Sequence, residues 1–158
     1  MIKVLKAVPL SAIDTRSLID ADASAGHVTI LEITLLAREL VAPLHRHTRE
    51  DEHTFVLAGQ IGAQLGQEVI STDPGDLIFK PRDQWHTFWN AGDEPARVLE
   101  IICPSGFERF FAEFSGDVER LSPETSRAIG ARYGLEFDFS SAPGLMQEHD
   151  VMFGGKHQ

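Results

Sequence analysis

Short runs of alternating apolar and polar residues, separated by glycine, proline and other turn residues, fill much of the chain up to position 104. Alternation with a period of two is the pattern of strands that bury one face. The runs recur at intervals of about ten residues, a spacing typical of closed or sandwich-like all-β domains. The pattern therefore predicts an all-β core built from short strands.

The longest β-branched run covers residues 26–36, and its composition favours a strand that is largely covered on both faces. A shift of one residue would exchange its two faces, so two registers are open. In one register, the interior face carries Thr29, Leu31, Ile33 and Leu35. In the other, it carries Val28, Ile30, Glu32 and Thr34. The second register would make Glu32 a candidate acid or base in a pocket, but we favour an exposed or ion-paired Glu32 because glutamate is rarely buried.

Less regular segments flank this run. Near the amino terminus we expect an edge strand or arm around residues 3–10, followed by a helical turn at 14–19. Further along, the runs 60–65 and 68–70 predict a hairpin in which Gly66 supplies the positive φ of a two-residue turn.

After Pro104 the apolar period changes from that of a strand to that of a helix. Phenylalanines at positions 107, 110, 111 and 114 predict a helix with one aromatic face. We expect this face to pack against the outside of the sheet, rather than to close an end of the barrel or cover a partner subunit. A second helix is indicated by Ser122 as N-cap, Pro123 in the first turn and Gly134 at the stop.

Composition and charge narrow the possible partners and compartment. The chain has 158 residues, a formal net charge of −10 and one cysteine, Cys103, so an intrachain disulfide is excluded. Its acidic balance disfavours nucleic acid and anionic membrane surfaces. No apolar run resembles a signal peptide or a membrane span. We therefore expect a cytoplasmic protein whose partner is a small molecule or another protein.

Candidate chemistry begins at His45 and His47, which are two residues apart at the start of an alternating segment. Side chains two apart in a strand point to the same side, so the two imidazoles can act together. A carboxylate follows at Glu52, and a second segment with a strand–turn–strand pattern, residues 75–90, contributes His86. Imidazole and carboxylate together suit a divalent first-row metal ion.

In these two segments the chain resembles the cupin superfamily. Eight positions match the two-part signature of that family, and they are His45, His47, Glu52, Gly59, Gly75, Pro81, His86 and Asn90. The resemblance covers about residues 31–104. The chain departs from the pattern at two glycine positions, now Glu39 and Asp83, and Asp tolerates the left-handed turn geometry better than Glu does.

The resemblance implies a fold, a boundary and a ligand set. It implies an all-β, double-stranded β-helix, that is, a jelly-roll or cupin barrel with C-terminal helices, in a single domain over 1–158. We place the barrel core at about 27–104, a helical extension at about 105–135 and a tail at 136–158, in which His149 and His157 are surface residues. The implied metal ligands are His45, His47, Glu52 and His86, and the family also suggests a homodimer.

Strand alternation assigns the neighbours of these ligands to two sides. On the ligand side, the expected substrate pocket is formed by Thr54, Val56 and Phe88. On the other side, we expect His53, Trp85 and Trp89 to lie outside the barrel, where a dimer contact is one role open to the two tryptophans. Asn90 is expected to fix a turn at the end of its strand.

Three functions are compatible with this site. The first is a metal-dependent oxygenase of the dioxygenase type, acting on a small apolar or aromatic substrate with Fe, Mn, Ni, Zn or Cu as the divalent ion. The second is a non-catalytic cupin that binds or senses a metal or small molecule. The third is a Lewis-acid isomerase or lyase, which would require several charged or polar side chains inside the barrel. Fold alone does not choose among them.

Overall fold

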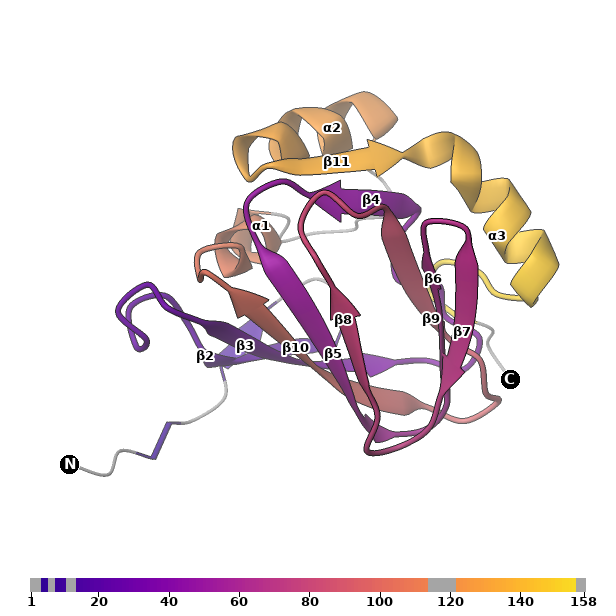
Figure 1. The fold of residues 1–158 in the computed structure, drawn as a ribbon, viewed down its shortest axis with the longest axis horizontal. Coiled ribbons are helices and arrows are strands. Elements are labelled where there is room, and N and C mark those ends of the chain that lie inside the picture. The colour runs from indigo at the N-terminus through magenta and orange to yellow at the C-terminus, as the bar shows by residue number, and fades with distance from the viewer. Residues whose placement is uncertain (1–3, 6–7, 11–13, 114–121, 156–158) are drawn as a thin grey trace.

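The computed structural model describes residues 4–5, 8–10, 14–113 and 122–155. Within them, the strands form two sheets in which neighbouring strands run antiparallel. One sheet has the order β1-β2-β3-β10-β5-β8, and the other has the order β11-β4-β9-β6-β7 (Figure 1). From β3 to β11 the chain passes from one sheet to the other at every step except that from β6 to β7, which is the arrangement of a double-stranded β-helix, as predicted. The strands are β1 (Val8–Leu10), β2 (Thr15–Ile19), β3 (Thr29–Leu35), β4 (Leu44–His47), β5 (Asp51–Ala58), β6 (Ile61–Leu65), β7 (Glu68–Thr72), β8 (Leu77–Lys80), β9 (His86–Asn90), β10 (Ala96–Cys103) and β11 (Leu135–Asp138).

The structure resolves the register of β3. Its interior face is the first of the two alternatives, namely Thr29, Leu31, Ile33 and Leu35, all buried. Glu32 points to the other side, where its carboxylate is 2.7 Å from Arg16 and 3.0 Å from Arg97. The ion-paired Glu32 is thus confirmed, and Glu32 is not part of an interior site.

Turns occur where the sequence predicted them. Gly66 has φ 59° between β6 and β7, which pair from Ile61–Thr72 to Leu65–Glu68. Asp83 adopts φ 65° at one of the two positions where the family pattern has glycine, so an aspartate does accommodate the left-handed turn there. Near the other position, the residue with positive φ is Arg38 rather than Glu39.

The expected helical turn at 14–19 is wrong. Residues Thr15–Ile19 form β2, which pairs with both β1 and β3. Alternating burial of Thr15 and Ser17 against exposed Arg16 is the period of a strand, and pairing with β3 satisfies the backbone of this segment. Part of the expected edge strand at 3–10 is seen as β1, and residues 1–3 and 6–7 lie outside the described part.

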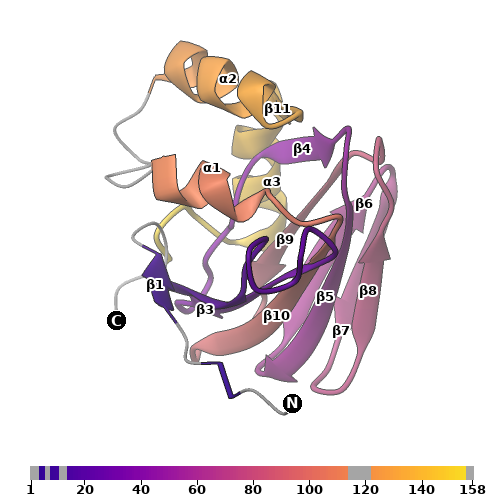
Figure 2. The same ribbon diagram turned by 90° about the vertical axis from the view of Figure 1, so that its left-hand side faces the viewer.

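The C-terminal third adds helices to the barrel. They are α1 (Glu108–Glu113), α2 (Pro123–Arg132), the short 3-10 helix η2 (Phe139–Ser141) and α3 (Ala142–His149). Ser122 caps α2 by accepting from the backbone N–H of Thr125, as predicted. In both Figure 1 and Figure 2, α2 and β11 lie above β4. No helix of the described ranges has the length and apolar character needed to cross a bilayer.

The segment expected to be a tail is part of the fold. β11 extends the second sheet by pairing with β4, from Leu135–His47 to Asp138–Leu44. Beyond it, α3 covers Trp89, whose indole stacks on His149 with ring centroids 4.1 Å apart. Trp89 is therefore buried by its own chain rather than free for a dimer contact, and His149 is half-buried rather than a surface residue. His157 lies outside the described residues.

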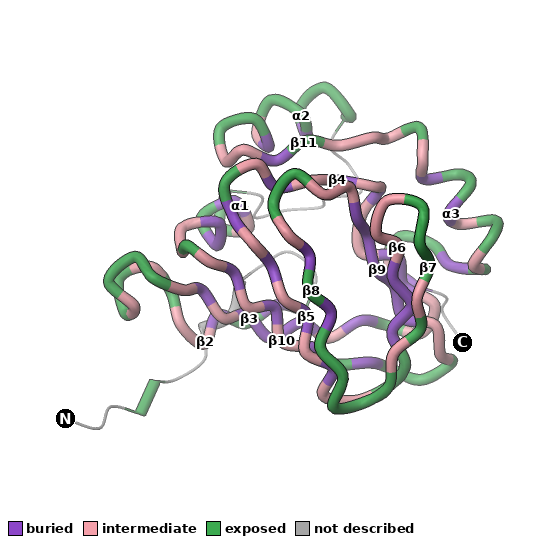
Figure 3. The backbone as a smooth tube through the Cα atoms, in the orientation of Figure 1, coloured by how far each residue is buried: buried purple, intermediate pink, exposed green. Residues whose placement is uncertain are grey.

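The aromatic face of α1 was also assigned to the wrong neighbour. Phe107 and Phe110 belong to the same buried cluster as the barrel residues Leu31 and Val56. They are thus part of the interior core and do not pack on the outside of a sheet. Figure 3 shows how burial differs between the barrel and the helices: β9 is buried along its length, whereas much of α2 is exposed. Phe114 lies outside the described residues.

Candidate metal centre

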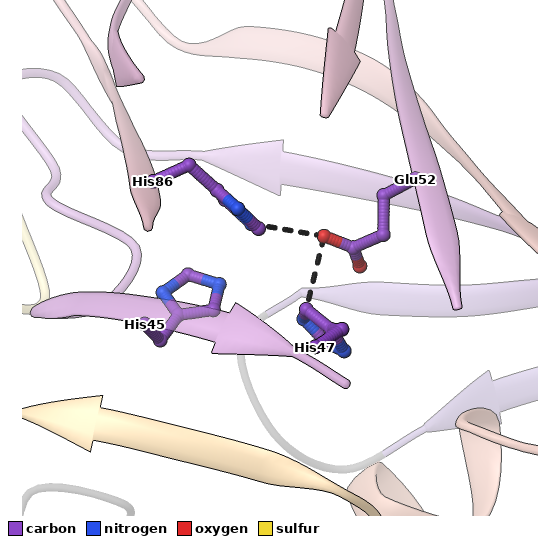
Figure 4. Close-up of side chains that lie close together, drawn as sticks. All are labelled: His45, His47, Glu52 and His86. Atoms are coloured by element: carbon purple, nitrogen blue, oxygen red, sulfur yellow. Dashed lines mark hydrogen bonds and ion pairs between the residues drawn. The ribbon is translucent and has the colours of Figure 1, made fainter. Parts of the chain in front are cut away.

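Three strands carry the four predicted ligands to one place. His45 and His47 lie on β4, Glu52 on β5 and His86 on β9. β4 and β9 are paired so that His45 is directly opposite His86. β5 belongs to the other sheet, and Glu52 reaches across the barrel towards the imidazoles (Figure 4). The group is therefore assembled from both sheets.

The potential ligand atoms of these four buried side chains all lie within 4.8 Å of one another. The Glu52 Oε2 atom is 3.0 Å from His86 Nε2 and 3.3 Å from His47 Nε2. Two ligands at right angles around an ion, each at a bond length of about 2.1 Å, are about 3.0 Å apart. The spacing of the cluster therefore fits a single small divalent ion.

Hydrogen bonds determine which ring nitrogen faces the cluster. His45 Nδ1 is 2.9 Å from the carbonyl of Pro43, and His86 Nδ1 is 2.9 Å from that of Gln84. A carbonyl oxygen can only accept, so both Nδ1 atoms carry the proton. In neutral rings, this leaves the Nε2 lone pair as the free donor to a metal. For His86 that lone pair faces a carboxylate oxygen, and two acceptors at this distance call for a cation that both can bind.

The electrostatic environment favours the ligand forms of these groups. Burial lowers the pKa of His45 well below its usual range, and the neighbouring imidazoles lower it further. Burial is also the main cause of the lowered pKa of His86. For Glu52, burial alone would raise the pKa, but His47, Lys80 and His86 together hold the pKa well below its usual range. Two neutral imidazoles and an ionised carboxylate are the forms that bind a metal.

A buried ion pair next to Glu52 was missed by sequence reasoning. Lys80 is 1% exposed, and its Nζ lies 2.8 Å from Glu100 Oε2 and 3.4 Å from Glu52 Oε2. Thr54 Oγ1 donates to the other oxygen of Glu100. Burial raises the pKa of Glu100, whereas the two carboxylates raise the pKa of Lys80 against the effect of its own burial. The barrel thus contains charged groups beyond the four candidate ligands.

The alternation of buried and exposed residues along β8 indicates that Lys80 lies on the inner side of the strand. Along β8, Leu77 and Phe79 are exposed, whereas Ile78 and Lys80 are buried. Lys80 lies on the same side as Ile78 and opposite Glu52 in register. A lysine is so seldom buried that this position would ordinarily be assigned to the surface.

The neighbouring side chains can now be placed. Thr54 and Val56 are fully buried, and Phe88 is buried with its ring centroid 4.7 Å from Lys80 Nζ. His53 points away from Glu52 and stacks on Phe79 with ring centroids 4.9 Å apart, as expected for the outer side.

Two other side chains close to the motifs have structural contacts. Trp85 lies under the guanidinium of Arg46, at 5.0 Å. The Asn90 side chain donates to the carbonyls of Leu36 and Glu94 and accepts from the N–H of Gly92. It therefore fixes the chain around the end of β9, as predicted.

C-terminal elements complete the surroundings of the histidines. The Phe107 ring lies edge-on to His47, with centroids 4.4 Å apart, and Phe137 on β11 is paired with His45. Thr48, in the turn after β4, donates from both its N–H and its hydroxyl to the carbonyl of Gly134. The α2–β11 junction therefore holds the turn that connects the two histidines of β4 with Glu52.

Comparison with known proteins identifies relatives of this arrangement. Residues 31–102 match a sequence model of the cupin domain. The chain is 29% identical over 106 residues to gentisate 1,2 dioxygenase 1 of Aquipseudomonas alcaligenes, a match that covers 63% of this chain and 30% of that protein. It is 32% identical over 101 residues to gentisate 1,2-dioxygenase of a Streptomyces species, covering 60% of this chain and 28% of that protein. The chain thus spans less than a third of the length of these two relatives.

A solved structure supports the fold independently of sequence. KdgF from a Halomonas species superposes with a TM-score of 0.56 at 15% identity, over 66% of this chain and 90% of that one. All four side chains of the candidate metal centre lie within the segment 31–102 that matches the cupin domain. This segment, somewhat less than half of the chain, is therefore similar to the cupin domain, and the two-sheet barrel that it builds has the fold of KdgF.

Proposed function

We propose that His45, His47, Glu52 and His86 bind one divalent metal ion and that the loaded protein is an oxygenase for a small aromatic or otherwise apolar substrate. The observation that carries this proposal is the convergence of four buried donor atoms within 4.8 Å. Three imidazoles and one carboxylate leave positions of an octahedral ion open to other molecules, the arrangement of catalytic rather than structural sites. A redox-active ion such as Fe or Mn would supply dioxygen chemistry there.

The chain's own residues have separate tasks in this proposal. The imidazoles and Glu52 hold the ion, while Thr54, Val56 and Phe88 form the wall against which the substrate rests. Val56 and Phe88 are part of the buried apolar cluster, which suits an aromatic ring and excludes water. The similarity to gentisate dioxygenases over about 100 residues supports the choice of oxygenase. A homodimer and a cytoplasmic location remain predictions.

The interior ion pair favours a second candidate. Lewis-acid isomerases and lyases need side chains that hold or move a proton beside the metal. Lys80 and Glu100 are buried groups of this kind, and Lys80 Nζ lies 3.4 Å from Glu52. With Zn bound, such chemistry on a sugar or keto acid would be expected instead of oxygen consumption.

Oxygen uptake separates the candidates. Metal-free protein is loaded anaerobically with Fe²⁺, Mn²⁺, Ni²⁺, Cu²⁺ or Zn²⁺, mixed with a panel of diphenols and hydroxybenzoates, and then exposed to oxygen. The proposal expects substrate-dependent uptake with at least one redox metal and none in His47→Ala. Metal binding without uptake would favour a binding protein, and turnover of a sugar or keto acid without uptake would favour the second candidate.

A further inference from the structure

The three imidazoles of the candidate metal centre differ in how their outer nitrogen is held. His45 and His86 each donate from Nδ1 to the carbonyl of the residue two positions earlier. The Nδ1 atom of His47 is buried and has no hydrogen-bond partner among the described residues. A buried polar atom without a partner is uncommon and calls for an explanation.

Glu50 faces this unpartnered atom. Its Oε2 is 3.8 Å from His47 Nδ1, and it too is buried and lacks a hydrogen-bond partner in the described part of the chain. Both side chains are more than nine-tenths buried. The distance is too long for a hydrogen bond, yet a movement of less than 1 Å would make one. A donor and an acceptor are thus placed opposite each other without being joined.

From this pair we infer that Glu50 is a positioning residue for His47, accepting a hydrogen bond from Nδ1 when Nε2 binds the metal. The inference rests on the proposed metal site. A neutral imidazole that binds through Nε2 carries its proton on Nδ1, and an acceptor at that proton fixes the tautomer and the ring direction. Backbone carbonyls provide this acceptor for His45 and His86, and Glu50 provides it for His47.

The turn that carries Glu50 is held firmly enough for this task. Thr48 donates to the Gly134 carbonyl, and Arg49 Nη1 donates to the Arg132 carbonyl at 3.0 Å. Asp51, the next carboxylate, points elsewhere and pairs with Arg82 at 2.9 Å. The adjacent carboxylates of Glu50 and Asp51 therefore point in different directions, and substitution of Asp51 serves as a matched control for substitution of Glu50.

The test measures Co²⁺ affinity of the metal-free full chain by competition with a chelator, together with the visible spectrum of bound Co²⁺. Glu50→Ala is expected to weaken binding by about 10- to 100-fold, the usual effect of losing such a partner, and to change the spectrum because the His47 ring is no longer fixed. Glu50→Gln keeps an accepting oxygen and should recover most of the loss. Asp51→Ala should match the wild type.

Two results would overturn the inference. One is wild-type affinity and spectrum in Glu50→Ala. The other comes from a crystal structure of the wild-type protein loaded with Zn²⁺, in which His47 Nδ1 should lie within about 3.2 Å of a carboxylate oxygen of Glu50. An Nδ1 atom that donates to another acceptor would contradict the assignment. This second test does not depend on whether Glu50→Ala folds. A wild-type chain that binds no Co²⁺ would instead remove the proposed metal site itself.

Discussion

Lys80 and Glu52 lie directly opposite each other on paired strands β8 and β5, with Nζ 3.4 Å from Oε2 inside the barrel. The same ammonium group is 2.8 Å from Glu100. One buried cation is therefore shared by two carboxylates, one of them a proposed metal ligand. The charge of the candidate metal centre depends on this lysine as well as on the ion.

Removing the lysine charge should strongly destabilise the metal-free protein. Lys80→Met leaves two carboxylates buried without their cation, and loss of one partner of a buried ion pair costs roughly 3–5 kcal/mol. Urea denaturation measures the change in the free energy of unfolding. The control is Arg82→Met, which removes the exposed partner of Asp51 and should leave the unfolding midpoint close to that of the wild type. Equal midpoints for the two variants would show that the interior pair is not important for stability.

Gly134 should tolerate no side chain. Its φ is 70°, and an added Cβ would be 2.7 Å from Thr48 Oγ1 and 2.9 Å from Arg49 Nε. Because Thr48 is held by its hydrogen bond to Gly134, it cannot move away without loss. We expect Gly134→Ala to destabilise the protein by about 1–3 kcal/mol.

The matched variant for this prediction is Gly144→Ala. Nothing lies within 4 Å of a Cβ at this position in α3, so the change should be neutral or stabilising by up to about 1 kcal/mol. Melting temperatures of the two variants give the comparison. If Gly134→Ala melts at or above the wild-type temperature, the close contact between the α2–β11 junction and the turn after β4 is wrong.

The stability of the metal-free protein should fall as the pH decreases below about 6.5. Burial keeps His45 and His86 neutral in the folded state, with pKa values below those of unfolded histidines. Below pH 6.5 the unfolded chain therefore binds protons that the folded chain does not, which favours unfolding by at most about 1.4 kcal/mol per pH unit for each ring. Urea titrations from pH 7.5 to 5.5 measure this slope. His45→Gln should make it shallower, and an unchanged slope in that variant would contradict the assignment.

Most strands of the barrel and the pairing of His45 with His47 were predictable because their signals are local, whereas the full set of four candidate ligands came from the resemblance to the cupin signature. Two-residue spacing places His45 and His47 on one side of a strand, and alternation marks the strands regardless of what they pair with. The register of β3 was open, because the run 26–36 by itself shows neither the core that buries Leu31 nor the arginines of β2 and β10 that pair with Glu32.

Features that depend on contacts between distant segments could not be predicted in this way. Burial of Lys80 requires Glu100 from β10, 20 residues later. Pairing of β11 with β4 joins residues that are about 90 positions apart, and it turns an acidic segment that resembled a tail into an edge of the second sheet. The position of Phe107 against His47 likewise follows from the path of the chain after β10 and not from the helical period.

The most direct test of the account is the metal content of the purified protein. Wild type and the single variants His45→Ala, His47→Ala, Glu52→Ala and His86→Ala are stripped of metal, incubated with each of Fe²⁺, Mn²⁺, Co²⁺, Ni²⁺, Cu²⁺ and Zn²⁺, desalted and analysed by mass spectrometry of the elements. We predict about one ion per wild-type chain for at least one metal and a sharp loss in every variant. A wild type that retains none of these ions, or variants that retain as much as the wild type, would contradict the central claim.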